Sequence, residues 1–214
     1  MFSNPLERLR ADSSAKVPIL VGNTENDESL LEVGMSNLTA FLEGTLPRAT
    51  ISPDFVRSLY PGENDTVVIS HSLRDLTFKC PVELWSAAII GRGSNVFRYT
   101  YGAVFEDLQI FAGAGAWHGS ELGPLFGTFN RSTATQAEIT WTNTFQRTIA
   151  NFIKNPDNSP AINWPKYIAG PSAKTLAKLA YHENVQINNF VESVTSASLD
   201  GPCDALWDQF LDLA

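Results

Sequence analysis

The first clear pattern along the chain is a short apolar run, which a polar loop separates from apolar residues at helical spacing. Residues 17–22 form this run between turn residues, a pattern typical of a buried strand in a parallel sheet. The loop at 23–29 holds three carboxylates, and helical spacing then extends from Leu30 to Leu42. Strand, acidic loop and helix predict an α/β unit with functional groups at the carboxyl end of the strand.

The middle of the chain reads as mostly helical, with one further strand. Residues 51–60 predict a short helix, and helical spacing returns from about residue 65 to 90. Within that stretch, Cys80-Pro81 predicts a break between two helices, because the residue before a proline is biased away from helical geometry. Residues 96–101 alternate as a second buried strand would.

Amphipathic patterns continue in the last third of the chain. Apolar residues every three to four positions predict a helix over 136–153 that packs on the sheet. Residues 163–167 read as a turn anchored by aromatic side chains. A terminal helix is predicted over 204–213, with Leu206, Trp207 and Phe210 facing inward.

Composition indicates a globular chain and excludes two classes of partner. The 214 residues are 43% hydrophobic and 11% aromatic, which suffices for the core of one domain. A formal charge of −8, with scattered basic residues, opposes binding to nucleic acid or to an anionic membrane. No apolar run approaches the roughly 20 residues that span a bilayer. The N-terminal residues lack the features of a signal peptide.

The cysteines and histidines carry no metal-binding spacing, and no cofactor motif is present. Cys80 and Cys203 fit one long-range disulfide, but two buried free thiols would give the same pattern. Asn37, Asn64 and Asn130 each begin an N-x-S/T glycosylation acceptor, which favours a secreted protein.

One histidine occupies a loop suited to chemistry. His118 lies between Trp117 and Gly119 in a segment rich in small residues, 113–127, which leaves its imidazole sterically open. Its ordinary pKa of about 6.5 allows proton transfer near neutral pH. The structural alternative is a loop histidine that only hydrogen-bonds a carbonyl group. His71 and His182 lie in stretches without a partner motif and are interpreted as structural.

Taken in order, several segments resemble the C-terminal part of the type-B carboxylesterase/lipase family, the cholinesterase-like branch of the α/β-hydrolases. The acid loop is most similar to that of secreted fungal members. The segments that carry the resemblance are 17–29, 78–81, 118–127, 142–152, 164–167 and 203–210. The resemblance implies an α/β fold that is the C-terminal portion of an α/β-hydrolase, with an incomplete, mostly parallel sheet flanked by helices. Residues 1–214 would then be a single partial domain, with the upstream half of the fold missing.

The same resemblance implies the acid and the base of a catalytic triad. His118 would be the general base and Asp27 the acid, with Glu28 as the alternative one position later. Glu121 would be either a neighbour of this pair or a carboxylate at the start of a helix. The resemblance also implies a disulfide between Cys80 and Cys203. The substrate would be a small-molecule carboxylic ester, no cofactor is implied, and the protein would be secreted.

The nucleophile that such an enzyme needs is not found in these residues. Serine esterases of this fold carry it on a G-x-S-x-G turn. The nearest segments, 34–38 around Ser36 and 170–174 around Ser172, lack the second glycine. We therefore expect the chain alone to be inactive. Two other interpretations stay open: a non-catalytic scaffold of the cholinesterase-like type for binding or adhesion, and a truncated gene product without independent activity.

Overall fold

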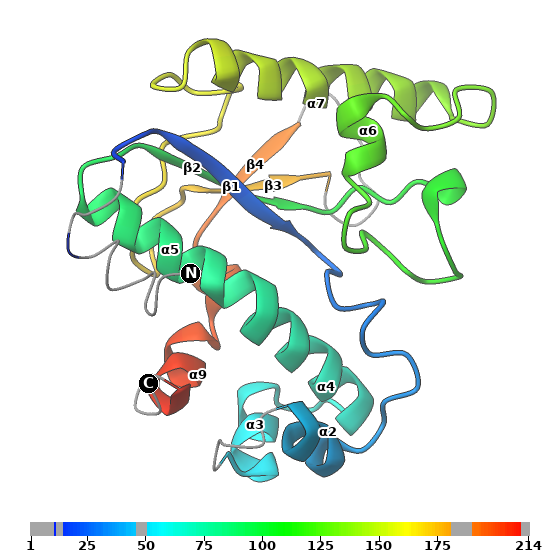
Figure 1. The fold of residues 1–214 in the computed structure, drawn as a ribbon, viewed down its shortest axis with the longest axis vertical. Helices are drawn as coiled ribbons and strands as arrows, with labels where there is room; N and C mark the ends of the chain where they lie inside the picture. Colours follow the sequence, from blue (N-terminus) through cyan, green and yellow to red (C-terminus); the bar gives the residue numbers. More distant parts are fainter. Residues whose placement is uncertain (1–10, 12–14, 46–50, 181–189, 211–214) are drawn as a thin grey trace.

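A computed structural model describes residue 11 and residues 15–45, 51–180 and 190–210. Its centre is a four-stranded sheet in the order β1-β2-β3-β4, with helices on both faces (Figure 1). The first three strands are parallel and the fourth is antiparallel to the third. The strands are Ile19–Thr24, Val96–Tyr101, Leu176–Leu179 and Val191–Val194. This mostly parallel sheet confirms the predicted α/β class.

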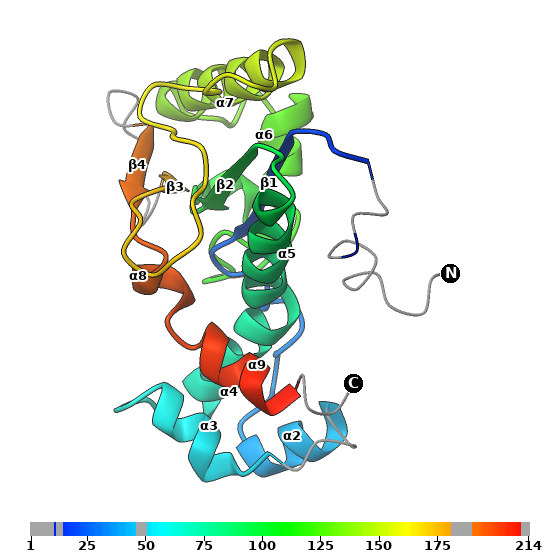
Figure 2. The ribbon, with the colours of Figure 1, turned by 90° about the vertical axis from the view of Figure 1, so that its left-hand side faces the viewer.

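Helix α7 lies along one face of the sheet and α5 along the other (Figures 1 and 2). Helices α2 and α3 pack beside α4, away from the sheet. The helical segments are α2 Leu38–Thr45, α3 Pro53–Leu59, α4 Asp65–Arg74, the π-helix η1 Asp75–Lys79, α5 Cys80–Gly91, the 3₁₀ helix η2 Glu106–Leu108, α6 Leu122–Phe126, α7 Gln136–Lys154, α8 Ala197–Asp200 and α9 Cys203–Phe210. No helix in the described part of the chain is both long enough and apolar enough to cross a membrane.

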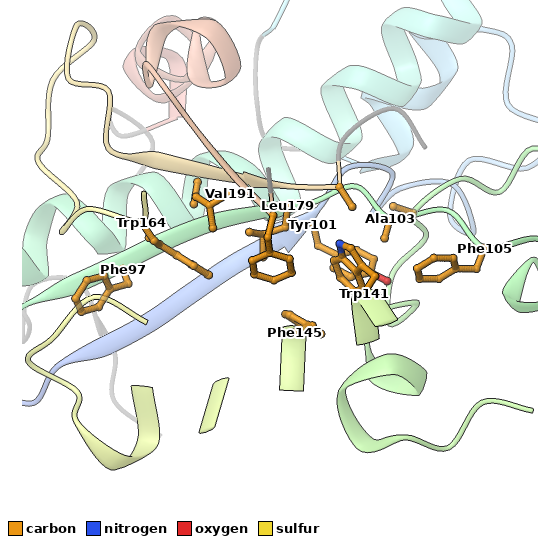
Figure 3. Close-up of a cluster of buried hydrophobic side chains, with 13 residues drawn as sticks. Phe97, Tyr101, Ala103, Phe105, Trp141, Phe145, Trp164, Leu179 and Val191 are labelled. Atoms are coloured by element: carbon orange, nitrogen blue, oxygen red, sulfur yellow. The ribbon is translucent and has the colours of Figure 1, made fainter. Parts of the chain in front are cut away.

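The main core lies between α7 and the sheet (Figure 3). Phe97 and Tyr101 point to this face from alternate positions of β2, and Trp141 and Phe145 meet them from α7. The Thr135 hydroxyl caps the start of α7 by accepting the N–H of Glu138 at 3.1 Å. The amphipathic pattern therefore predicted α7 to within one residue, because a single face of the helix is buried.

The opposite face of the sheet combines apolar packing with one buried ion pair. Val96 of β2 packs against Ile89 of α5. The neighbouring Arg98 is fully buried, and its guanidinium donates two hydrogen bonds to Asp200, one of them at 2.8 Å. Such a pair needs both members, since removing either leaves an uncompensated charge in the core.

The predicted break at Cys80-Pro81 was wrong. Helices α4 and α5 are joined through the π-helical turn η1, and Pro81 lies in the first turn of α5. Within a continuous helix a proline has no N–H to donate and its ring crowds the preceding turn, and the widened turn directly before Pro81 is the kind of irregularity that accommodates it. The irregularity that the proline indicated is present, but it is a widened turn rather than a break.

The helix expected from Leu30 was also wrong, since the acid loop continues as turns and α2 begins only at Leu38. The Asn37 side chain accepts the N–H of Ala40 at 3.1 Å and thereby fixes this later start. Leu30 and Leu31 are 44% and 50% exposed. Their helical spacing was therefore coincidental.

Strands β3 and β4 were not predicted, because four residues each are too few for an alternating pattern to stand out. The terminal helix is described over Cys203–Phe210, with Leu206 buried and Trp207 partly buried. Residues 211–213 of the predicted helix and His182 lie outside the described residues.

The disulfide between Cys80 and Cys203 is present. It joins the first residues of α5 and α9, with the two Cα atoms 5.2 Å apart and both residues buried. It fastens the C-terminal helix to the long α4–η1–α5 helix.

Candidate active site

The loops that follow β1 and β2 meet at one edge of the sheet, because parallel neighbouring strands end on the same side. Two hydrogen bonds of 3.0 Å join Asn26 to Ala116: the Asn26 N–H donates to the Ala116 carbonyl, and the Ala116 N–H donates to Asn26 Oδ1. A parallel β-bridge pairs Asn26 with Trp117. These contacts place residue 27 beside residue 118.

At this junction Asp27 contacts His118. Oδ1 of Asp27 lies 2.8 Å from Nδ1 of His118, and Oδ2 accepts the N–H of Thr24 at 2.8 Å. The Asp27 side chain is 4% exposed, whereas that of His118 is 60% exposed. Because an ionised carboxylate can only accept, Nδ1 of a neutral imidazole must donate, and the free lone pair is then on Nε2. This arrangement leaves the solvent-accessible ring able to take up a proton at Nε2.

The local backbone explains how the histidine is presented. Gly115 has a φ of +68°, and a Cβ there would collide with the Asn26 side chain, so both features require glycine. Gly119 has a φ of +93°, which turns the chain directly after the histidine. The Trp117 indole N–H donates to the Leu108 carbonyl at 3.0 Å and anchors the loop. The Phe78 ring packs on the imidazole at 5.0 Å between centroids.

Comparison with known proteins agrees with this geometry. The sequence profile described as "Carboxylesterase family" matches residues 1–196. The chain belongs to the carboxylesterase family. One curated relative is "Secreted lipase 5" of Gibberella zeae, which is 25% identical over 202 residues. The alignment covers 92% of this chain and 33% of that protein, so the chain spans about a third of the length of this relative.

In this member of the family, Glu28 faces away from the imidazole. Its Oε1 accepts a hydrogen bond of 3.0 Å from the Ser70 hydroxyl on α4, and its Oε2 is buried without a hydrogen-bond partner. Burial raises the pKa of Glu28 to about 7, although Arg74 and Ser70 partly offset the effect. Of the two acids that the sequence offered, Asp27 is the one in contact with His118, while its role in catalysis stays a prediction.

The buried carboxyl of Glu28 predicts a pH-dependent stability. Between pH 4.5, its ordinary pKa, and about 7, the folded chain keeps a proton that the unfolded chain releases, so the free energy of unfolding falls as the pH rises. Glu28→Gln removes this loss. We expect the stability of the variant relative to wild type to grow by about 3 kcal/mol between pH 4 and pH 8, at 1.36 kcal/mol for each pKa unit.

Urea unfolding at both pH values measures this change. Glu43→Gln, at an exposed position on α2, is the control for loss of one surface carboxylate. If the free energy of unfolding differed between Glu28→Gln and wild type by the same amount at pH 4 and at pH 8, the prediction would be contradicted.

Glu121 is a further carboxylate near the pair. It directly precedes α6, but its side chain makes no capping hydrogen bond. Burial raises the pKa of Glu121, and the nearby Asp27 carboxylate adds to the effect. Glu121 thus stands at the start of a helix and also within electrostatic reach of Asp27, so both interpretations from the sequence stay open.

The other candidate residues lie elsewhere. Ser36 and Ser172 are exposed, and within the part of the chain that the structure describes no hydrogen bond joins either to His118. His71 packs against Tyr60, and burial lowers its pKa, with the nearby Arg74 adding to the effect, as expected for a structural histidine. In residues 15–45, 51–180 and 190–210, no three His, Cys, Asp or Glu side chains are grouped to hold a metal ion.

The three glycosylation candidates are on the surface. Asn37, Asn64 and Asn130 are all exposed. Each also accepts a local backbone N–H through its side-chain oxygen, at 3.1 Å in every case. These capping contacts give a second physical reason for asparagine at each position, so glycosylation stays a prediction.

Proposed function

We propose that this chain supplies the acid and the base of a secreted serine carboxylic-ester hydrolase. The observation that carries the proposal is the 2.8 Å contact between buried Asp27 and the exposed ring of His118. In this mechanism, Nε2 of His118 takes the proton of a serine hydroxyl as the oxygen attacks the ester carbonyl. It then returns the proton to the alcohol leaving group, while Asp27 holds Nδ1 and stabilises the imidazolium.

The serine itself belongs to sequence outside these 214 residues. No G-x-S-x-G turn occurs in the chain. In hydrolases of this fold, one N–H of the oxyanion hole directly follows the serine of that turn, and another comes from a separate loop. The substrate would be a small-molecule carboxylic ester bound between this chain and the nucleophile segment. The family match, the name of the lipase relative and the buried disulfide support secretion and ester hydrolysis.

This proposal predicts that the 214-residue chain alone does not hydrolyse esters above the buffer rate. Loss of a triad nucleophile alone costs about 10⁶ in turnover, and the contacts that give the residual rate are also missing. The purified chain is assayed with short-chain and long-chain nitrophenyl esters beside His118→Ala. Turnover that disappears in the variant would reveal a nucleophile within the chain, and Ser36 and Ser172 would be replaced first.

A positive test uses the chain joined to the coding sequence that precedes it. If that sequence encodes a G-x-S-x-G turn, the longer protein should hydrolyse the same esters. If it encodes a related domain without the serine, the non-catalytic binding scaffold becomes the better interpretation.

A further inference from the structure

We propose that the π-helical turn Asp75–Lys79 positions the imidazole of His118, with Phe78 as the positioning residue. The inference rests on the proposed function, because it concerns how the imidazole of the general base, His118, is oriented. It joins two features that the triad mechanism does not use: an irregular helical turn, and an aromatic ring on the face of the imidazole.

The turn interrupts what would otherwise be one long α-helix. The N–H of Cys80 donates to the carbonyl of Asp75, five residues earlier, whereas an α-helix bonds four residues apart. One additional residue in a single turn changes the facing direction of the following residues by about 100° relative to α4. The register within this turn therefore decides which of its side chains meets His118, and that side chain is Phe78.

Polar side chains hold the turn at both ends. The fully buried Asp75 carboxylate accepts hydrogen bonds from Tyr60 and Arg74, both at 3.0 Å, and pairs with the Lys79 ammonium at 2.6 Å. At the other end, the Arg98 guanidinium of β2 donates to the Lys79 carbonyl at 3.4 Å. Since Tyr60 and Arg98 come from other parts of the fold, the turn is fixed by tertiary contacts as well as by its own sequence.

His118 needs a second contact of this kind. Its side chain is 60% exposed, and Asp27 holds only Nδ1. A ring held at one atom can still swing about that hydrogen bond, and the swing displaces Nε2. The Phe78 ring lies 5.0 Å away at an interplanar angle of 39°, and it is the only aromatic ring packed on His118 within the described residues. Asp27 and Phe78 together fix both the position and the plane of the imidazole.

The test measures the imidazole in the 214-residue, disulfide-bonded chain by NMR. Two readouts are used: the rotamer populations of His118 from side-chain couplings, and the rate at which its Nδ1 proton exchanges with water. Phe78→Ala should give mixed rotamers and roughly three- to tenfold faster exchange, the range expected for loss of one aromatic pair. Phe78→Tyr keeps the ring and should restore both values. Phe126→Ala, which removes a ring that is 71% exposed on α6, is the matched control.

Unchanged rotamers and exchange in Phe78→Ala, with its melting temperature retained, would overturn the inference. So would a Phe78→Tyr variant that behaves like Phe78→Ala. Should Phe78→Ala fail to fold, Phe78→Leu fills most of the volume without a ring and is judged by the same two readouts. Neither readout uses ester turnover. If Phe78→Ala frees the His118 ring but the longer protein never hydrolyses esters, the positioning role holds and the proposed function fails. If Phe78→Ala leaves the ring unchanged and the longer protein is an active esterase, the proposed function holds and the positioning role fails.

Discussion

In a protein that joins this chain to its serine nucleophile, His118→Ala will lower ester turnover by about 10⁵- to 10⁶-fold. The reason is that no other described side chain contacts both the Asp27 carboxylate and solvent in the way this ring does. Asp27→Asn should lower turnover by about 10⁴-fold, because an amide can stabilise the wrong tautomer of the ring. The rates are measured with nitrophenyl esters at saturating substrate.

Two variants serve as controls for this experiment. Glu28→Gln alters the acid beside Asp27 that bonds to Ser70, and we expect turnover to change less than about tenfold. His71→Gln is the second control. It alters a histidine that packs on Tyr60 and not on the acid loop. If Glu28→Gln lost as much activity as Asp27→Asn, the acid would have been assigned to the wrong residue.

Removing the disulfide by the double substitution Cys80→Ala and Cys203→Ala should lower the free energy of unfolding by about 4 to 5 kcal/mol. The bond closes a loop between residues 123 positions apart, so its loss restores a large conformational freedom to the unfolded chain. The two alanines also leave space between α5 and α9, where both cysteines are buried.

Urea unfolding of the variant and the oxidised wild type gives the size of this effect. Reduced wild type is the control, because it lacks the bond but keeps both sulfur atoms in the core. A loss below about 1 kcal/mol would show that the disulfide contributes little beyond the packing of its neighbours.

The sequence predicted those helices and strands in which hydrophobic and polar residues follow one regular spacing over enough positions. Strand β2 and helix α7 fall into this class, since each buries one face against the same core. The start of α2 was missed because the spacing of Leu30 and Leu31 imitated a buried helix, while the Asn37 cap carried the true signal. The turn η1 depends on partners such as Tyr60 and Arg98, which lie far from it in the sequence.

For the site, the sequence supplied the residues but could not choose between neighbouring acids. The order of motifs pointed to His118 and to the pair Asp27 and Glu28. The choice depends on the bridge between Asn26 and Trp117, which fixes the direction in which each acid points. The contact of Phe78 with His118 was not predicted, because nothing in the sequence gives the register of a π-helical turn.

The central claim, that Asp27 prepares His118 to act as a base, is tested most directly by the tautomer of the imidazole. Nitrogen-15 chemical shifts of His118 in the 214-residue chain, recorded at a pH where the ring is neutral, distinguish a proton on Nδ1 from one on Nε2. We predict the proton on Nδ1 in wild type and in Glu28→Gln, with Nε2 unprotonated, and a mixture of tautomers in Asp27→Ala. A tautomer that is unchanged by Asp27→Ala, or that shifts in Glu28→Gln instead, would contradict the account.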